Sequence, residues 1–313
     1  MLNADIKEFQ FTSDFDGLVI SAVTAVPSET PNGVVQLVHG MNEHKERYFH
    51  FMDYLAGEGF ITVIHDNRGH GKSVCTPEDL GFMFRNGGEG FVSDIAQLTD
   101  LIKKTYSGLP LFMIGHNIGS LGARCFLKEH DDMINGLVVL GCPCYSPFSG
   151  IVRSIESALS KKQGSRFRSG AVADTASLSL GKKFPEDIPN TWLCSERKAV
   201  EEFNADPLCN FKPTLNGYES LLWLMREAYS KSGWSVKNPS LPIRFISGKD
   251  DPCMISEKKF FKAVKLMEKI GYDGISHRLF DGMRHEVLNE KNNIIVYKDI
   301  AKTLFSWIDR ISD

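Results

Sequence analysis

The fold of this chain is decided by residues 111–120, which read Leu111-Phe112-Met113-Ile114-Gly115-His116-Asn117-Ile118-Gly119-Ser120. An apolar run of strand length ends at the first glycine, and a helix-like segment, residues 121–127, follows the second. A buried strand that turns sharply into a helix is typical of sheets in which strands and helices alternate. Glycines on both sides of the turn let the strand and the helix approach closely.

The alternation of strands and helices extends in both directions from this stretch. Apolar and alternating runs predict strands at residues 6–12, 18–26, 34–38, 60–65, 136–140, 243–247 and 276–280. Periodic apolar positions predict helices at residues 91–106, 260–270 and 294–311. The first two strands surround an Asp-Phe-Asp-Gly turn and should form a hairpin. The remaining pattern predicts an α/β fold with a mostly parallel sheet covered by helices on both faces.

The alternation stops between residues 142 and 239. This segment is helical in patches, notably at residues 151–159 and 218–229, and it lacks strand-like runs. We therefore expect a core at residues 1–141 and 240–313, with a helical cap (lid) domain inserted at residues 142–239. Four apolar cap residues recur at helical spacing, either as an acyl-facing stripe or as the cap's own packing: Phe148, Ile151, Ile155 and Leu159. The basic cluster at residues 161–168 fits a solvated lid loop better than an anion site.

Composition places the chain among soluble globular proteins. Hydrophobic residues make up 42% and charged residues 24%, and a net charge of −3 gives no reason to expect a nucleic-acid partner. The seven cysteines are odd in number and scattered, which favours buried free thiols over disulfides. Cys142-Pro-Cys144 has no second pair at zinc-ligand spacing, so we expect no metal. Neither a leader-like segment nor an apolar run of about 20 residues is visible. We expect a cytoplasmic protein without stable membrane insertion.

The turn at Gly115–Gly119 has the frame of a nucleophile elbow. In the Gly-x-Ser-x-Gly elbow of α/β-hydrolases, a tight strand-to-helix turn lifts a serine above the sheet. Here the central residue is Asn117, so the frame is present and the serine is missing. The expected oxyanion hole needs two backbone N–H groups. We assign them to Ile118, which follows the elbow residue, and to Met41, in the loop after the strand at residues 34–38.

A triad also needs a carboxylate and a histidine, in the chain order nucleophile, acid, base. Asp250 and Asp251 follow the strand at residues 243–247, and His285 follows the last strand. We favour Asp251 as the acid and His285 as the base. The expected catalytic set is therefore Asn117, Asp251 and His285.

Four motifs together resemble one known family. HGMNEHKERY at residues 39–48 is similar to the HGxxEHxxRY motif of monoacylglycerol lipases and related lysophospholipase-like (serine aminopeptidase S33-type) hydrolases. HDNRGHGKS at residues 65–73 matches their HDxxGHGxS loop, and DPLC at residues 206–209 resembles an element late in their cap. GHNIGS at residues 115–120 matches their GHSMGS elbow except at the nucleophile, and Asn42 stands where they usually have glycine.

The resemblance implies an α/β-hydrolase fold, no cofactor, and an esterase or lipase acting on small-molecule esters. Acylglycerols, lysophospholipids and other lipid-like carboxylic esters are the expected substrates. An amide nitrogen is delocalised into its carbonyl and cannot serve as the activated nucleophile. Asparagine nevertheless tolerates the positive φ common at elbows, so Asn117 should preserve the fold and stop the chemistry.

Three interpretations of Asn117 remain open. The first is an ester hydrolase disabled or substrate-trapping at this one residue. The second is a natural pseudoenzyme that binds an acyl ligand, or another hydrophobic ester or acid, without hydrolysis. The third is chemistry with another nucleophile, such as an aspartate formed by deamidation, which would resemble aspartate-nucleophile dehalogenases. Because the two oxyanion donors are backbone groups, we expect the side-chain change to leave them free for an ester carbonyl.

Overall fold

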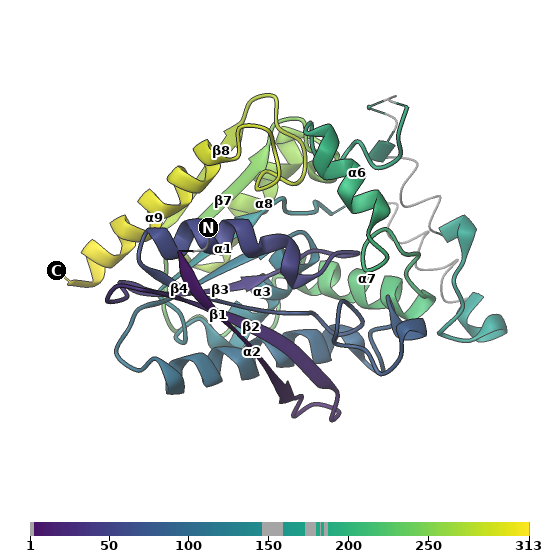
Figure 1. Cartoon of the computed structure of the whole chain (residues 1–313), viewed down its shortest axis with the longest axis horizontal. Helices are drawn as coiled ribbons and strands as arrows, with labels where there is room; N and C mark the ends of the chain where they lie inside the picture. Colours follow the sequence, from purple (N-terminus) through teal and green to yellow (C-terminus); the bar gives the residue numbers. More distant parts are fainter. Residues whose placement is uncertain (1–2, 146–158, 173–179, 182, 185–186, 313) are drawn as a thin grey trace.

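The sheet of this protein lies at the centre of a layered molecule (Figure 1). The computed structural model describes residues 3–145, 159–172, 180–181, 183–184 and 187–312. Within these residues the strands form one eight-stranded sheet in the order β1-β2-β4-β3-β5-β6-β7-β8. The strands are β1 (Ala4–Thr12), β2 (Val19–Pro27), β3 (Gly33–Val38), β4 (Phe60–His65), β5 (Leu111–His116), β6 (Gly136–Leu140), β7 (Ile243–Gly248) and β8 (Ile275–Phe280).

Only β2 runs against the direction of the other strands of this sheet. β1 pairs antiparallel with β2, and β2 pairs antiparallel with β4. The pairs from β4 through β3, β5, β6, β7 and β8 are all parallel. The predicted hairpin and the mostly parallel sheet are therefore confirmed. The carboxyl ends of β3, β5, β7 and β8 meet at one edge of the sheet, where α/β proteins bind ligands.

Helices cover both faces of the sheet, as the sequence predicted. One face carries α1 (Phe49–Gly57) and α9 (Ile294–Ser312). The other carries α2 (Gly87–Thr105), α3 (Ile118–His130) and α8 (Glu257–Ile270). Alternate residues of β5 point to opposite cores: Leu111 and Met113 pack with α2 and α3, while Phe112 and Ile114 pack with α1 and α9. This period of two explains why a strand buried on both faces reads as a continuous apolar run.

The described part of the segment between β6 and β7 contains α6 (Arg197–Ala205) and α7 (Leu215–Tyr229) and no strand. α7 packs on α2 and α3, and it confirms the helix predicted at residues 218–229. α6 was not predicted, although Val200 and Phe203 bury one of its faces. Phe148, Ile151 and Ile155 of the proposed stripe lie outside the described residues.

The basic cluster of the cap segment is only partly solvated. Lys161 and Lys162 are exposed. Arg168 donates hydrogen bonds to main-chain carbonyl oxygens next to η2 (Pro77–Asp79), at 2.8 and 2.6 Å. Arg166 pairs with Asp79 and lies over the ring of Phe82. The two arginines therefore contact residues in and around η2, but Arg166 is itself exposed, so the solvated-loop interpretation holds for the lysines and for Arg166 and fails only for Arg168.

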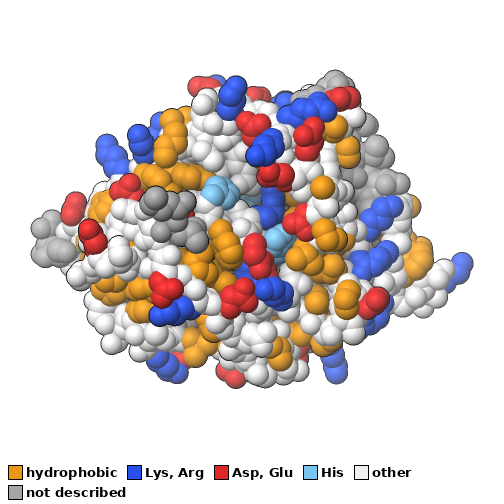
Figure 2. Space-filling view, viewed as in Figure 1, with side chains coloured by type: hydrophobic (Ala, Val, Ile, Leu, Met, Phe, Trp, Pro, Cys, Tyr) orange, Lys and Arg blue, Asp and Glu red, His pale blue; other side chains and the backbone are white. Residues whose placement is uncertain are grey.

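The surface shown in Figure 2 mixes acidic and basic side chains without a large patch of one sign. Among the described residues, no helix combines the length and the apolar character needed to cross a membrane.

Candidate active site

The elbow is a strained turn between β5 and α3. Asn117 has φ 51° and ψ −119°, a conformation that few non-glycine residues adopt. The two flanking glycines are required by close packing. A Cβ on Gly115 would lie 2.6 Å from the carbonyl oxygen of Gly119, and one on Gly119 would lie 2.2 Å from that of Val38. The sequence frame therefore builds the turn that it predicted.

The structure brings the three expected catalytic residues together. Asn117 Nδ2 lies 2.7 Å from His285 Nε2, and His285 Nδ1 lies 3.0 Å from Asp251 Oδ1. These contacts require His285 to donate from Nδ1 and to accept the amide N–H at Nε2. The neighbouring Asp250 is half-exposed and lies 3.6 Å from the exposed Lys183. Of the two candidate acids, the one favoured from sequence is the one in contact with His285.

The local structure holds Asp251 in a fixed position. Its carboxylate accepts hydrogen bonds from Ser247 Oγ and from the backbone N–H of Cys253, each at 2.8 Å. Burial raises the pKa of Asp251, but the positive field and hydrogen bond of His285 lower it below the usual range. Burial lowers the pKa of His285, yet the Asp251 carboxylate raises it to a net value well above normal. The pair is therefore arranged to stabilise an imidazolium.

The two expected oxyanion donors also converge, but they are not free. β3 and β5 are parallel neighbours, with Val38 paired to Gly115, so their carboxyl-end loops lie side by side. Asn117 Oδ1 accepts the N–H of Ile118 at 2.7 Å and that of Met41 at 3.4 Å. The expectation that the substitution leaves both donors unoccupied is wrong, because the amide oxygen reaches them from the elbow itself.

Comparison with known proteins identifies the family of this chain. The family model described as serine aminopeptidase, S33 matches residues 29–292. The chain belongs to the serine aminopeptidase S33 family.

Similar proteins extend over nearly the whole chain. Monoglyceride lipase of Mus musculus is 26% identical over 309 residues, covering 96% of this chain and 94% of that protein. A carboxyl esterase from Bacillus coagulans, solved in complex with glycerol, has a TM-score of 0.89 at 24% identity and covers 97% of this chain and 99% of that one. A soluble variant of Saccharomyces cerevisiae monoglyceride lipase, solved with a substrate analogue, has a TM-score of 0.72 at 18% identity and covers 99% and 96%. The likenesses in structure show the α/β-hydrolase fold.

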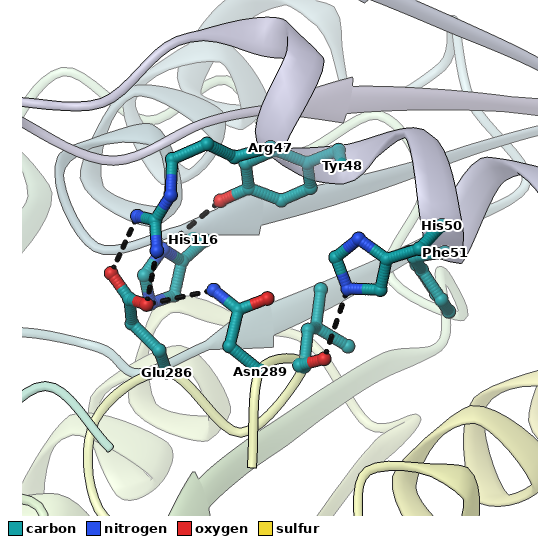
Figure 3. A pocket seen from close by; sticks show the side chains of 8 residues that line it. Arg47, Tyr48, His50, Phe51, His116, Glu286 and Asn289 are labelled. Carbon is teal, nitrogen blue, oxygen red and sulfur yellow. Dashed lines mark hydrogen bonds and ion pairs between the residues drawn. The ribbon is translucent and has the colours of Figure 1, made fainter. Parts of the chain in front are cut away.

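A cluster of largely buried polar residues lies next to this site. Figure 3 shows five of its members: Arg47, Tyr48, His116, Glu286 and Asn289. Glu43 Oε1 accepts hydrogen bonds from Tyr48 Oη at 2.8 Å and from the Gly40 backbone N–H, and it lies 3.0 Å from His116 Nδ1. Burial raises the pKa of Glu43, but His116 and Arg47 lower it well below normal. One carboxylate therefore connects the loop after β3 with the residue that precedes the elbow. His116 is the residue that precedes the elbow, and its Nδ1 also lies 3.1 Å from Tyr48 Oη.

Arg47 extends the cluster to the loop that carries His285. Its guanidinium donates to both oxygens of Glu286, each at 2.8 Å (Figure 3). It also donates to Glu43 at 3.1 Å. Asn289 adds a hydrogen bond to Glu286 at 2.7 Å. Burial raises the pKa of Glu286, and the charge and hydrogen bonds of Arg47 lower it. The sequence motif at residues 39–48 contains Glu43 and Arg47, but it does not reveal that Arg47 pairs with Glu286, 239 residues later.

Two residues of the segment between β6 and β7, Trp192 and Phe211, contact residues of the site. The Trp192 ring lies 5.3 Å from that of His285, measured between centroids. Asn42, at φ 61°, donates to the carbonyl oxygen of Phe211 at 2.9 Å, so the residue that replaces the family's glycine contacts the cap segment. No periodicity or motif marked Trp192 as a neighbour of His285.

Two clusters hold residue types that bind metals, although each of their histidines already has two partners. His44, Asp206 and Cys209 form one cluster, and Asp251, Cys253 and His285 form the other. His44 is 2.6 Å from Glu46 and 2.8 Å from Asp206, so its two ring nitrogens both face carboxylates. Burial lowers the pKa of His44, but these carboxylates raise it above the usual value. All seven cysteines are free, and five of them are buried.

Proposed function

We propose that this chain is a carboxylic ester hydrolase of the monoacylglycerol lipase type in which Asn117 stops the first chemical step. One observation carries the proposal: His285 Nε2 lies 2.7 Å from the elbow side chain while Asp251 orients the opposite ring nitrogen at 3.0 Å. An idle histidine would have little reason to keep this alignment. The site therefore requires only a hydroxyl at position 117 to be complete.

In the serine form each residue would have a defined role. His285 would take the proton of the hydroxyl at position 117 as it attacks the ester carbonyl, and Asp251 would stabilise the resulting imidazolium. The N–H groups of Met41 and Ile118 would bind the developing oxyanion. Asparagine cannot make the attack, and loss of a triad nucleophile costs on the order of 10⁶ in kcat.

The proposed substrate class is supported by the segment between β6 and β7 and by the similar proteins. Residues 142–239 would act as a cap over the core formed by residues 1–141 and 240–313, and they would line an acyl groove. Contacts of Trp192 with His285 and of Asn42 with Phe211 support this placement. The similarity to monoglyceride lipases favours small lipid-like esters such as monoacylglycerols and lysophospholipids. We further propose that the protein acts in the cytoplasm.

A single substitution tests the proposal. Asn117→Ser should hydrolyse short- to medium-chain esters and monoacylglycerols in a panel assay, while the wild-type chain stays near background. Asn117→Ala is the matched control, because it removes the amide without adding a nucleophile. A folded serine variant with no turnover on a broad ester panel would contradict the proposal.

The second candidate function is ligand binding without hydrolysis. It is favoured over hydrolysis by the position of Asn117 Oδ1, which satisfies the two N–H donors that would otherwise stabilise the oxyanion of a hydrolytic step. A ligand must displace this oxygen, so we expect Asn117→Ala to bind a fatty acid or a slowly hydrolysed ester analogue more tightly than the wild type. Calorimetric titration of both forms measures the difference. Tight binding by the wild type, together with an inactive serine variant, would favour the pseudoenzyme.

A further inference from the structure

The Asn117 side chain lies in the site as a bound carboxamide would. Its oxygen faces the N–H groups of Ile118 and Met41, at 2.7 and 3.4 Å. Its nitrogen lies 2.7 Å from the basic nitrogen of His285. An acyl-transfer site binds the carbonyl oxygen of its substrate with such donors and keeps its base beside the leaving atom. The amide is thus both the residue that replaces the nucleophile and an occupant of the reaction site.

We propose that this site hydrolyses its own Asn117 side chain, converting it to aspartate and releasing ammonia. Water is the co-reactant. Its oxygen forms a bond to Asn117 Cγ while His285 Nε2 takes one of its protons, and the carbonyl electrons move onto Oδ1. When the tetrahedral carbon collapses, the Cγ–Nδ2 bond breaks and the imidazolium gives its proton to the leaving nitrogen. The products are a carboxylic acid and ammonia, which become a carboxylate and ammonium after one proton transfer.

The surroundings favour each part of this reaction. The backbone N–H groups of Ile118 and Met41 polarise the amide carbonyl, and they would stabilise the oxyanion as they would that of an ester. The Asp251 carboxylate, 3.0 Å from Nδ1, stabilises the imidazolium that forms in between. His285 and Asp251 are buried, whereas Asn117 is partly exposed, so water can approach the amide from the open side.

The product is held better than the starting amide. One carboxylate oxygen can keep the hydrogen bonds from the backbone N–H groups of Ile118 and Met41. The other can accept a hydrogen bond from the protonated Nε2 of His285. This arrangement replaces an amide contact with a charge-assisted hydrogen bond, which is roughly twice as strong as a neutral one. Hydrolysis therefore converts a neutral contact at the elbow into an ion pair.

Ordinary deamidation does not explain such a conversion at this position. In that route the next backbone nitrogen attacks the side-chain carbonyl to form a succinimide, which opens to both aspartate and isoaspartate. The route is fastest before glycine, and four asparagines precede a glycine: Asn32, Asn86, Asn135 and Asn216. Asn117 precedes the β-branched Ile118, whose nitrogen begins α3 and points its N–H at Oδ1. Direct hydrolysis by His285 should give aspartate alone.

The experiment follows the wild-type protein by peptide mass spectrometry after fresh purification and incubation at pH 7 and at pH 9, because the raised pKa of His285 leaves more of its imidazole neutral, and able to act as a base, at the higher pH. The peptide that contains residue 117 should gain the mass of an amide-to-acid exchange, and fragmentation should identify aspartate without isoaspartate. His285→Gln removes the base, and conversion should slow by about 100-fold or more. His277→Gln, an exposed histidine on β8, is the matched control and should convert like the wild type.

A second measurement needs no variant. In urea the site is lost, so conversion at residue 117 should stop, while the four Asn-Gly sites should continue to deamidate. Three outcomes would each overturn the proposal: failure of residue 117 to convert in the folded protein, isoaspartate among its products, or conversion in His285→Gln or in urea as fast as in the folded wild type. None of these readouts uses an ester, so the result does not depend on whether Asn117→Ser hydrolyses one.

Discussion

Arg47 is the residue whose removal should most weaken the support of the site. Its side chain is only 12% exposed, and it neutralises Glu286 and Glu43, which are 4% and 3% exposed. Arg47→Met keeps much of the buried side-chain volume and removes the charge. The change would leave two buried carboxylates without their shared cation. We therefore expect a large loss of folding stability.

The size of this loss of stability depends on the hydrogen bonds that Glu43 and Glu286 keep in Arg47→Met. Breaking a buried ion pair by removing one partner costs about 3–5 kcal/mol. Glu43 would keep its hydrogen bonds from Tyr48 and Gly40, and Glu286 would keep that from Asn289. These contacts favour the lower half of the range. At about 2 °C per kcal/mol for a chain of this size, the melting temperature should fall by roughly 6–8 °C.

Thermal unfolding followed by circular dichroism measures this effect, with Arg197→Met as the matched control. Arg197 also donates to both oxygens of one carboxylate, Asp187, but both side chains are mostly exposed, so its loss should hardly change the melting temperature. A fall of less than about 2 °C in Arg47→Met would refute the reasoning, because it would mean that the buried carboxylates tolerate the loss of their cation.

The difference in stability between the wild type and Arg47→Met should depend on pH, and this dependence gives a second check. The pKa values of Glu43 and Glu286 are lowered in the folded protein, with Arg47 among the causes. Lowered carboxyl pKa values contribute stability above the unfolded value, about 4.3, and this stability is lost as the pH falls. The gap between wild type and Arg47→Met should therefore stay wide from pH 7 down to about 4.3 and should narrow as the pH falls below that value. A gap that stays constant would point to lost packing instead of lost charge.

Three further predictions concern the site and its surroundings. In the serine background, Asp251→Asn should lower kcat by about 10⁴ in an ester assay, whereas Asp250→Asn should change it little; the reverse order would identify the other acid. His44→Gln should destabilise the protein more at pH 6 than at pH 9, because a raised histidine pKa contributes stability that is lost as the pH rises through it; equal melting-temperature losses at both pH values would contradict this. Gly119→Ala should cost about 3 kcal/mol or more in urea unfolding, since its Cβ would meet a β3 carbonyl oxygen at 2.2 Å. Gly170→Ala, which meets nothing within 4 Å, should be tolerated, and similar losses for both glycines would refute the steric argument.

Differences between the predicted and observed elements have local causes. The helix expected from residue 91 begins at Gly87, because three glycines in its first turn lower its helix propensity and hide it from a periodicity search. All three are closely packed: a Cβ would lie 2.5 Å from Met83 at Gly87, 2.5 Å from the Trp223 ring of α7 at Gly88, and 2.3 Å from Arg68 at Gly90. α6 has only nine residues and two buried apolar positions, too weak a pattern to stand out.

The sequence by itself determined the sheet, its direction and the identity of the residues at its carboxyl edge. Strand periodicity and the glycine frame are local properties, and parallel strands must bring their ends together, so Asn117, Asp251 and His285 could be assigned before the structure. Only the tertiary structure decided what the Asn117 amide does there. Its rotation depends on two N–H groups and one imidazole from three separate loops. The partner of Arg47 was equally hidden, because a side chain's choice among distant carboxylates depends on burial and distance, which the order of residues does not contain.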